Sequence, residues 1–210
     1  MFMDYFDFHH HKKNISFGIY NLDLTDKIPD SLYSVGIHPK DILYDKITEQ
    51  LNWLIENITE SCFAIGECGL DSFVPIDQNI QEEVFLRQIE ISNELKKPII
   101  IHCVRKFYEV ISFRKKANQA MIIHGFNKKE SIAHDLLKNN FYLSFGKAVL
   151  YNLSLQNTLK ITPLNKIFLE TDNEDFEIAT LYEKVAEIKG ISLEVLNEQI
   201  LENLEIIRHG

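Results

Sequence analysis

The stretch CFAIGE, residues 62–67, is an apolar run of strand-forming residues that ends on a carboxylate. Four further runs also end on residues that commonly bind metal ions: FDFHHH (6–11), PIIIH (98–102), MIIH (121–124) and IFLETD (167–172). Short apolar runs that alternate with helical patterns are typical of a parallel α/β fold. In a parallel barrel the carboxyl ends of all strands lie on one face, so we expect these terminal residues to converge.

Eight short apolar runs predict eight strands, which fit a closed, TIM-like (β/α)8 barrel. The predicted strands are Met3–Phe8, Ile15–Asn21, Tyr33–Ile37, Cys62–Gly66, Pro98–Ile101, Met121–Ile123, Tyr142–Phe145 and Lys166–Leu169. Helical periodicity predicts helices over Asp45–Ile58, Asp77–Leu95, Phe107–Lys116, Glu130–Asn139, Phe176–Lys189 and Ser192–Arg208.

The segment between His11 and Ile15 is too short to hold a helix. We therefore predict a shortened barrel in which the helix between strands 1 and 2 is missing. A short turn would pair these two strands antiparallel, and the alternative is another irregular connection.

The bulk properties indicate one globular domain, residues 1–210. The net charge of −9 opposes non-specific binding to nucleic acid by the whole surface. No apolar run approaches the roughly 18 residues of a membrane span, and the N-terminal residues lack the pattern of a signal peptide. We expect a cytoplasmic protein with no membrane association and no obligate protein partner. The odd number of cysteines, three, argues against a disulfide framework.

The residues at the strand ends form a ligand set for metal ions. In an extended chain His9 and His11 point to the same side, so both imidazoles can face one ion. Glu67 can bridge two ions, and Asp172 can bind one ion and steer the attacking water. The whole set suits two divalent ions, zinc, manganese or magnesium, held by His9, His11, Glu67, His102, His124 and Asp172.

Each of these residues alone is weak evidence, because an isolated histidine at a strand end is more often a core or surface residue. The run His9-His10-His11 also resembles the remnant of an affinity tag. Here, however, four of the eight histidines fall at strand ends together with two carboxylates. The combination therefore favours a metal-dependent hydrolase.

The order of the motifs resembles that of the TatD family of metal-dependent deoxyribonucleases, within the amidohydrolase-like barrels. The motifs that carry the resemblance are FDFHHH, VGIHP, AIGECGLD, QEEVFLRQIEISNELKKPIIIHC, IIHGF and FLETD. The resemblance extends from Phe6 to about Asn203, and GECGLD is among its most specific motifs. The resemblance implies a barrel that binds two or three divalent metals and hydrolyses phosphodiester bonds, typically of DNA.

By position, the resemblance implies two subsites that share Glu67. The first comprises His9, His11, Glu67 and Asp172, and the second comprises Glu67, His102 and His124. Glu67 and Asp172 would be the catalytic residues. His38 matches a position beside the scissile phosphate. Arg105 lies near the position of a family arginine that contacts phosphate, although an ordinary solvated loop cation is an equal alternative.

Several positions depart from the family pattern. Ser72 replaces an aromatic residue, and HGFN stands at 124–127 in place of HCFSG. Beginning with Asp172, residues 172–175 read DNED where the family usually has TDAP. The substrate loop that usually follows this aspartate is missing. Cationic residues near the strand ends provide either a rim that attracts phosphate or ordinary solvated loops: Lys12, Lys13, Lys40, Arg105, Lys106, Lys128 and Lys129.

Three functions remain open from the sequence. The first is a phosphodiesterase, with DNA as the expected substrate and deoxyribonuclease or exonuclease activity. The second is an amidohydrolase-type enzyme that cleaves a small ester, lactone or amide, which the missing substrate loop favours. The third is a non-catalytic metal-binding scaffold, against which the complete set of ligand residues argues.

Overall fold

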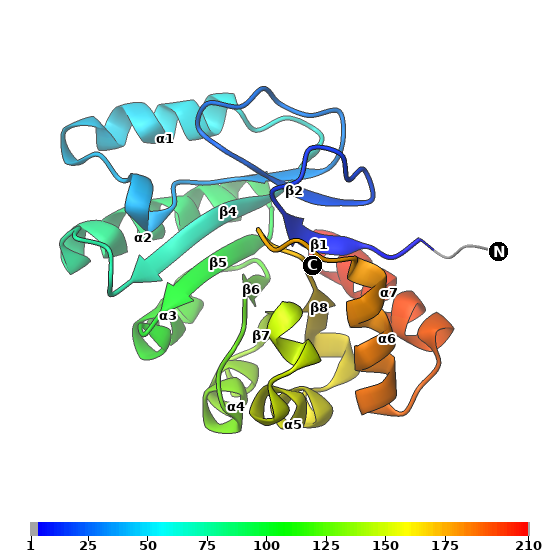
Figure 1. Ribbon diagram of the computed structural model, residues 1–210. Helices are drawn as coiled ribbons and strands as arrows, with labels where there is room; N and C mark the ends of the chain where they lie inside the picture. Colours follow the sequence, from blue (N-terminus) through cyan, green and yellow to red (C-terminus); the bar gives the residue numbers. More distant parts are fainter. Residues whose placement is uncertain (1–3, 210) are drawn as a thin grey trace.

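The eight strands form one parallel sheet in which each strand pairs with the next along the chain. The computed structural model describes residues 4–209 (Figure 1), so Met3, the first residue of the first predicted strand, lies outside the described residues. The strands are β1 (Asp7–His10), β2 (Gly18–Leu22), β3 (Tyr33–Val35), β4 (Cys62–Asp71), β5 (Ile99–Val104), β6 (Met121–Ile123), β7 (Phe141–Phe145) and β8 (Ile167–Leu169).

The sheet curves round until its first and last strands meet. The backbone N–H of Asp172, just beyond β8, donates to the carbonyl oxygen of His9 at 2.9 Å. The N–H of His11 donates to the carbonyl oxygen of Asp172 at 3.3 Å. The N–H of Thr171 also donates to the Asp7 carboxylate at 2.9 Å. The predicted TIM-like barrel is therefore confirmed, and its last contacts involve residues of the strand-end motifs themselves.

Within residues 4–209, seven α-helices accompany the strands: α1 (Ile47–Glu56), α2 (Gln78–Leu95), α3 (Phe107–Phe113), α4 (Glu130–Lys138), α5 (Leu153–Ile161), α6 (Ile178–Lys189) and α7 (Leu193–His209). The Asp77 carboxylate caps α2 by accepting from the N–H of Asn79 at 2.9 Å. Gly190 ends α6 with a φ of +67°, as a left-handed C-cap requires. The sequence analysis did not predict α5, which lies between β7 and β8.

The connection between β1 and β2 differs from one of the two predicted alternatives. Residues 11–17 contain no helix, as predicted, but the two strands pair parallel rather than antiparallel. The chain returns through a turn in which the N–H of Ile15 donates to the carbonyl oxygen of Lys12 at 3.3 Å, and the pairing shifts register between Asp7 and His10. The next connection, residues 23–32, also contains no helix. The shortened barrel thus lacks two helices on the same flank.

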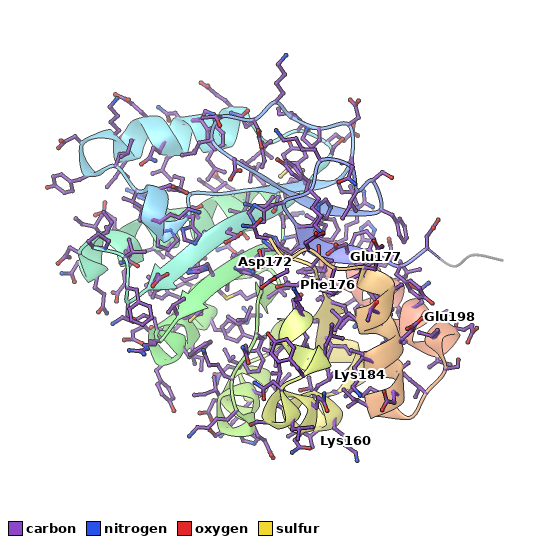
Figure 2. The ribbon with its side chains drawn as sticks, in the orientation of Figure 1. Lys160, Asp172, Phe176, Glu177, Lys184 and Glu198 are labelled. Carbon is purple, nitrogen blue, oxygen red and sulfur yellow. The ribbon has the colours of Figure 1, made fainter. Side chains whose placement is uncertain are left out.

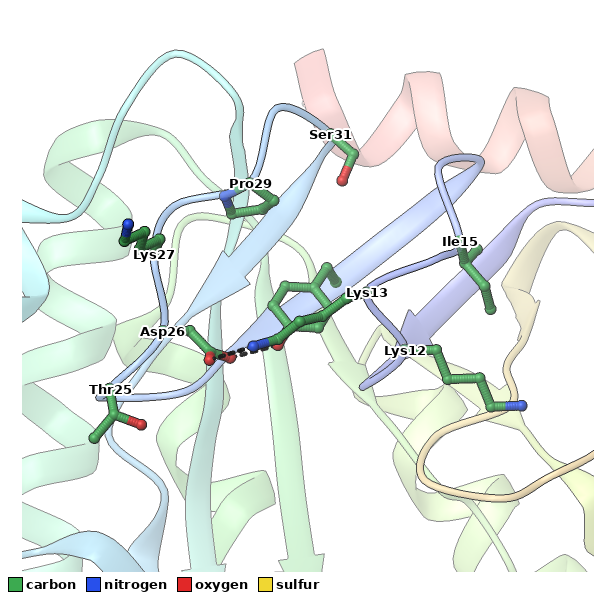
Figure 3. Close-up of a pocket in the computed structure, with 9 residues that line it drawn as sticks. Lys12, Lys13, Ile15, Thr25, Asp26, Lys27, Pro29 and Ser31 are labelled. Atoms are coloured by element: carbon green, nitrogen blue, oxygen red, sulfur yellow. Dashed lines mark hydrogen bonds and ion pairs between the residues drawn. The ribbon is translucent and has the colours of Figure 1, made fainter.

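A polar network holds these two helix-free connections against β2 (Figure 3). The hydroxyl of Tyr20 donates to the Asp26 carboxylate, and the Lys13 ammonium lies 2.7 Å from the same carboxylate. Between the connections lies a cavity of about 380 Å³, whose lining includes Ile15 and Pro29. Side chains of the two connections therefore cover this part of the barrel wall.

The strands are buried on both sides of the sheet. Residues Ile99–Ile101 and Met121–Ile123 are at most 1% exposed. Strands that pack against helices outside and side chains inside read as continuous apolar runs, which is why they could be recognised in the sequence. None of the helices formed within residues 4–209 has the length and apolar character needed to cross a membrane.

Candidate metal centre

Glu67 points into the barrel because β4 carries an extra residue at this place. Ile65 pairs with Ile99 of β5, whereas Cys68 pairs with Ile101, so three steps along β4 match two along β5. Such a bulge changes the direction of a side chain relative to regular alternation. The Glu67 side chain is 8% exposed and lies at the centre of the candidate site.

The glycines of the GECG motif allow β4 to approach β5 this closely. A Cβ atom on Gly66, whose φ is +152°, would lie 2.5 Å from the carbonyl oxygen of Ile100. A Cβ atom on Gly69, whose φ is +141°, would collide with the carbonyl oxygen of His102. Both glycines also adopt backbone angles that other residues avoid. The motif therefore encodes the bulge that positions Glu67.

The two carboxylate oxygens of Glu67 face different imidazoles. Oε1 lies 2.8 Å from Nε2 of His9 and 3.1 Å from Nε2 of His11. Oε2 lies 3.3 Å from Nε2 of His124, 3.7 Å from Nε2 of His38 and 3.9 Å from Nδ1 of His102. Glu67 thus has imidazole nitrogens beside each of its two carboxylate oxygens.

Asp172 faces the histidines on the Oε1 side of Glu67. Its Oδ1 lies 3.5 Å from Nε2 of His11 and 3.8 Å from Nε2 of His9. Its backbone has a φ of +52°, an uncommon conformation for a residue other than glycine. The side chain is 38% exposed, so Asp172 lies between the buried histidines and solvent.

The distances divide the candidate ligands into two overlapping groups. His9, Glu67, His124 and Asp172 offer ligand atoms that all lie within 4.8 Å of one another, and so do His38, Glu67 and His102. This differs in three respects from the division that the family resemblance implies. His124 groups with His9, and His38 groups with His102 as a potential ligand. His11 belongs to neither group, although its Nε2 lies 3.1 Å from Glu67 Oε1.

Two carboxylates that were not assigned from the sequence lie beside His102 and His124, near the ring nitrogen that faces away from Glu67. Asp71 Oδ2 lies 2.8 Å from Nε2 of His102, which leaves Nδ1 of that ring facing Glu67. Glu170 Oε1 lies 3.5 Å from Nδ1 of His124 and accepts from the Gly125 N–H at 2.5 Å. Carboxylates in this position orient imidazole ligands of metals. Both residues belong to recognised motifs, GLD and LETD. Their positions beside strand ends could therefore have identified them in the sequence as residues of the site.

The protonation of the site reflects this crowding. Burial opposes the charged form of His11, but hydrogen bonds with Asp172 and Glu67 raise its pKa to about 9. Burial also disfavours the ionised Glu67, yet the charges of His124 and His9 hold the pKa of its carboxyl well below the usual value. Burial lowers the pKa of His38 to about 3, and the neighbouring His102 contributes to this shift.

The donor set fits divalent metal ions of the borderline type. Imidazole nitrogens and carboxylate oxygens converge at the mouth of the barrel, and both are donor types that such ions accept. The Nδ1 atom of His9 is buried and has no hydrogen-bond partner among the described residues. The other nitrogen of that ring faces Glu67, so the environment orients a single nitrogen toward the cluster.

Several of the cations expected to contact substrate already contact other side chains of the protein. Arg105 follows β5, and its guanidinium carbon lies 4.5 Å from the centre of the Phe73 ring. Some cations of the proposed rim are paired with acidic groups: Lys12 with Asp175, Lys13 with Asp26, and Lys106 with Glu109. The rim therefore carries less free positive charge than its lysine content suggests.

The departures from the family pattern have local structural roles. The N–H of Ser72 donates to the carbonyl oxygen of Val104 at 3.1 Å and so extends the pairing of β4 with β5. Asn127 Oδ1 accepts from the side-chain amide of Asn152 at 3.3 Å. Neither interaction involves the metal-ligand candidates.

Only residues 173–177 connect Asp172 to α6, and Figure 2 labels Asp172, Phe176 and Glu177 in this part of the chain. Lys147 fixes this segment, because its ammonium lies 3.1 Å from Glu174 Oε2 and 5.9 Å from the centre of the Phe176 ring. The chain therefore enters α6 directly after this short connection. This agrees with the expectation that the longer substrate loop is missing here.

Comparisons with known proteins concern the family and the fold of the chain. The family model described as "TatD related DNase" matches residues 14–208. "Uncharacterized metal-dependent hydrolase YabD" of Bacillus subtilis is 31% identical over 195 residues, which cover 83% of this chain and 76% of that protein. "Uncharacterized metal-dependent hydrolase YcfH" of Escherichia coli K12 is 26% identical over 206 residues, which cover 89% and 77%. The crystal structure of YJJV, a TatD homolog from Escherichia coli, has the same fold, with a TM-score of 0.81, 17% identity and 98% coverage of both chains.

Proposed function

The chain belongs to the family of TatD-related DNases, and from this premise we propose that it hydrolyses phosphodiester bonds of DNA at a binuclear metal site. Family membership makes it a metal-dependent hydrolase, so a role as a non-catalytic scaffold is no longer needed to account for the site. The proposal concerns the substrate, the number of ions and the role of each residue.

The arrangement of Glu67 is the observation that carries the proposal. Its Oε1 faces His9 and His11, whereas its Oε2 faces His124, His38 and His102. Imidazole nitrogens therefore lie beside both oxygens of this one carboxylate, an arrangement that suits a carboxylate bridging two ions. Two ions held a few ångströms apart suit displacement at a phosphodiester, where both the attacking and the leaving oxygen need stabilisation.

We assign the proton transfer to Asp172. The ions, when bound, would lower the pKa of a water molecule and neutralise charge on the phosphate. The Asp172 carboxylate is part of the cluster yet 38% exposed, so it can accept a proton from a water that enters from solvent. Its position beside His11 and His9 also orients that carboxylate.

We assign supporting roles to the remaining residues. His102 and His124 would hold metal through the nitrogens that face Glu67, with Asp71 and Glu170 fixing the two rings. His38, close to His102, would either complete the second subsite or contact the phosphate beside it. The mixture of nitrogen and oxygen donors suits zinc or manganese, and magnesium is the alternative that the oxygen donors allow.

One observation favours a second candidate, hydrolysis of a small ester, lactone or amide. The connection from Asp172 to α6 is held by Lys147 and offers no extended loop over the site. Such a site has fewer contacts for a polymer than a site with a long loop. A small substrate would need only the metal cluster itself.

Hydrolysis assays with purified protein loaded with Mn²⁺ or Zn²⁺ test these alternatives. We expect release of nucleotides from single-stranded DNA, with slower hydrolysis of small carboxylic esters and lactones. Turnover of a small ester without any release of nucleotides would refute the proposal for DNA. Anomalous scattering from crystals loaded with metal would count the ions, and a single ion would refute the binuclear site.

A further inference from the structure

The exposed aromatic side chains of this protein gather at one end of the barrel. Among the Phe, Tyr and Trp residues within 4–209, the four that are more than half exposed are Tyr44 (70%), Phe73 (67%), Tyr108 (67%) and Tyr151 (71%). Each lies in a connection that leaves the carboxyl end of a strand or in the first turn of the following helix. This is the end of the barrel that carries the metal-ligand candidates.

Phe73 differs from the other three because a cation covers one face of its ring. The guanidinium carbon of Arg105 lies 4.5 Å from the ring centre, within the range of a cation–π contact. Arg105 adopts a left-handed backbone conformation, with a φ of +57°, which is unfavourable for a residue other than glycine. Phe73 nevertheless stays 67% exposed, so a large part of the ring remains open to solvent.

The Phe73–Arg105 pair is fixed in position relative to the candidate metal centre. The N–H of Phe73 donates to Asp71 Oδ1 at 2.8 Å, and the other oxygen of Asp71 lies 2.8 Å from Nε2 of His102. Arg105 in turn follows His102 by three residues along the chain. Both members of the pair are therefore connected to the same metal-ligand candidate.

We propose that Phe73 and Arg105 form a stacking platform for an unpaired nucleobase next to the phosphodiester that is cleaved. This inference rests on the proposed function and adds a subsite to it. Nucleobases stack on exposed aromatic rings and on guanidinium planes, and a ring already supported by a guanidinium offers both. A base paired within a duplex has its faces covered by its neighbours, so the platform would act on unpaired bases.

The alternative is that the contact between Arg105 and Phe73 only stabilises a loop. A structural role predicts that changes at Phe73 alter stability without any dependence on the bases of a ligand. A platform predicts that Phe73 distinguishes a strand that carries bases from a sugar–phosphate strand without them. The second property can be measured by binding alone.

Fluorescence anisotropy of two labelled probes with metal-loaded protein tests the platform. One probe is a single-stranded 12-mer with phosphorothioate linkages that resist hydrolysis, and the other is the same strand with abasic nucleotides throughout. We expect the unchanged protein to bind the first probe about tenfold more tightly than the second. Phe73→Leu should remove most of this difference, and Arg105→Gln should reduce it.

Tyr44→Leu is the matched control, because Tyr44 is equally exposed at the same end of the barrel but has no cation over its ring among residues 4–209. This variant should keep the tenfold difference. The platform is refuted if Phe73→Leu discriminates between the probes as the unchanged protein does, or if Tyr44→Leu loses as much. Equal binding of both probes, or binding of neither, would also refute it.

The test separates this inference from the proposed function. Base-dependent binding that is lost in Phe73→Leu, without release of nucleotides from DNA, would keep the platform and refute the hydrolysis of DNA. Release of nucleotides together with equal affinity for both probes would keep the proposed function and refute the platform.

Discussion

The two sides of Glu67 differ in how their histidines are supported. On the Oε2 side, Asp71 Oδ2 makes a 2.8 Å hydrogen bond with Nε2 of His102. On the Oε1 side, the far nitrogen of His9 is buried without a hydrogen-bond partner among the described residues. Nδ1 of His124 has none either, although Glu170 Oε1 lies 3.5 Å from it. A carboxylate bonded to the far nitrogen of an imidazole fixes the orientation of the ring and makes it a stronger ligand. The protein therefore fixes the orientation of His102 more firmly than that of His9.

The Oε1 side has Asp172 instead of a supporting carboxylate. Asp172 faces His11 and His9 from the solvent side. A group in this place can exchange protons with water, which a carboxylate buried behind a ring cannot do. If the site holds two ions as proposed, we expect the ion on the Oε2 side to bind more tightly and the Oε1 side to carry the proton transfer.

Removing the shared carboxylate should have the largest effect, because all five imidazoles lie within 4 Å of Glu67. We expect Glu67→Gln to lower the affinity of both ions by more than about a hundredfold and to abolish hydrolysis. Metal content after dialysis, measured by plasma mass spectrometry, checks this. A variant that kept both ions would show that Glu67 is not shared. A circular dichroism spectrum of the variant, compared with that of the unchanged protein, shows whether the variant is folded.

Asp172→Asn should separate binding from chemistry. The amide keeps the shape of the side chain but cannot accept a proton, so we expect most of the metal to remain and turnover to fall about a hundredfold to ten-thousandfold. Metal content and kcat, measured on the same preparation, check the prediction. If kcat were unchanged, Asp172 would have no role in proton transfer.

A change at Asp71 should weaken metal binding on the Oε2 side of Glu67 and leave the Oε1 side unaffected. Asp71→Asn weakens the support of His102, so we expect the affinity of one ion to fall about tenfold to a hundredfold while the other binds as before. Calorimetric titration with Mn²⁺ resolves the two steps. Asp26→Asn is a matched control, because Asp26 accepts from Tyr20 and Lys13 on the barrel wall and contacts none of the ligand candidates. Equal losses in both steps would contradict the separate support of the two sides.

The positions of the metal-ligand candidates were predictable because each follows an apolar strand. His102 and His124 come directly after continuous apolar runs, and a parallel barrel places such positions on one face. The pairing of ligands into groups was not predictable. It depends on the bulge at Glu67, which changes the direction of a side chain by one step of register.

Other features escaped the sequence analysis for different physical reasons. The parallel pairing of β1 with β2 depends on a return segment without a helix, residues 11–17, and such a segment has no periodic pattern to reveal it. Asp71 and Glu170 look like ordinary polar residues beside the ligands, and only distances identify what they support. The contact of Arg105 with Phe73 joins two connections far apart in sequence, so no local pattern indicated it.

Over a single pH unit, the smallest predicted effect is the pH dependence of metal binding. Interactions with Asp172 and Glu67 raise the pKa of His11 to about 9 despite its burial, so its ring carries a proton at pH 7 that must leave before it can bind an ion. Apparent affinity should therefore rise with pH, up to about tenfold per unit for each displaced proton, and this contribution should level off above about pH 9. Since the pKa of His38 is lowered to about 3, chiefly by burial, His38 should release none over this range. Calorimetry in two buffers of different ionisation enthalpy counts the protons at pH 7. His11→Ala should reduce that number by one, and an unchanged number would show that His11 is already neutral.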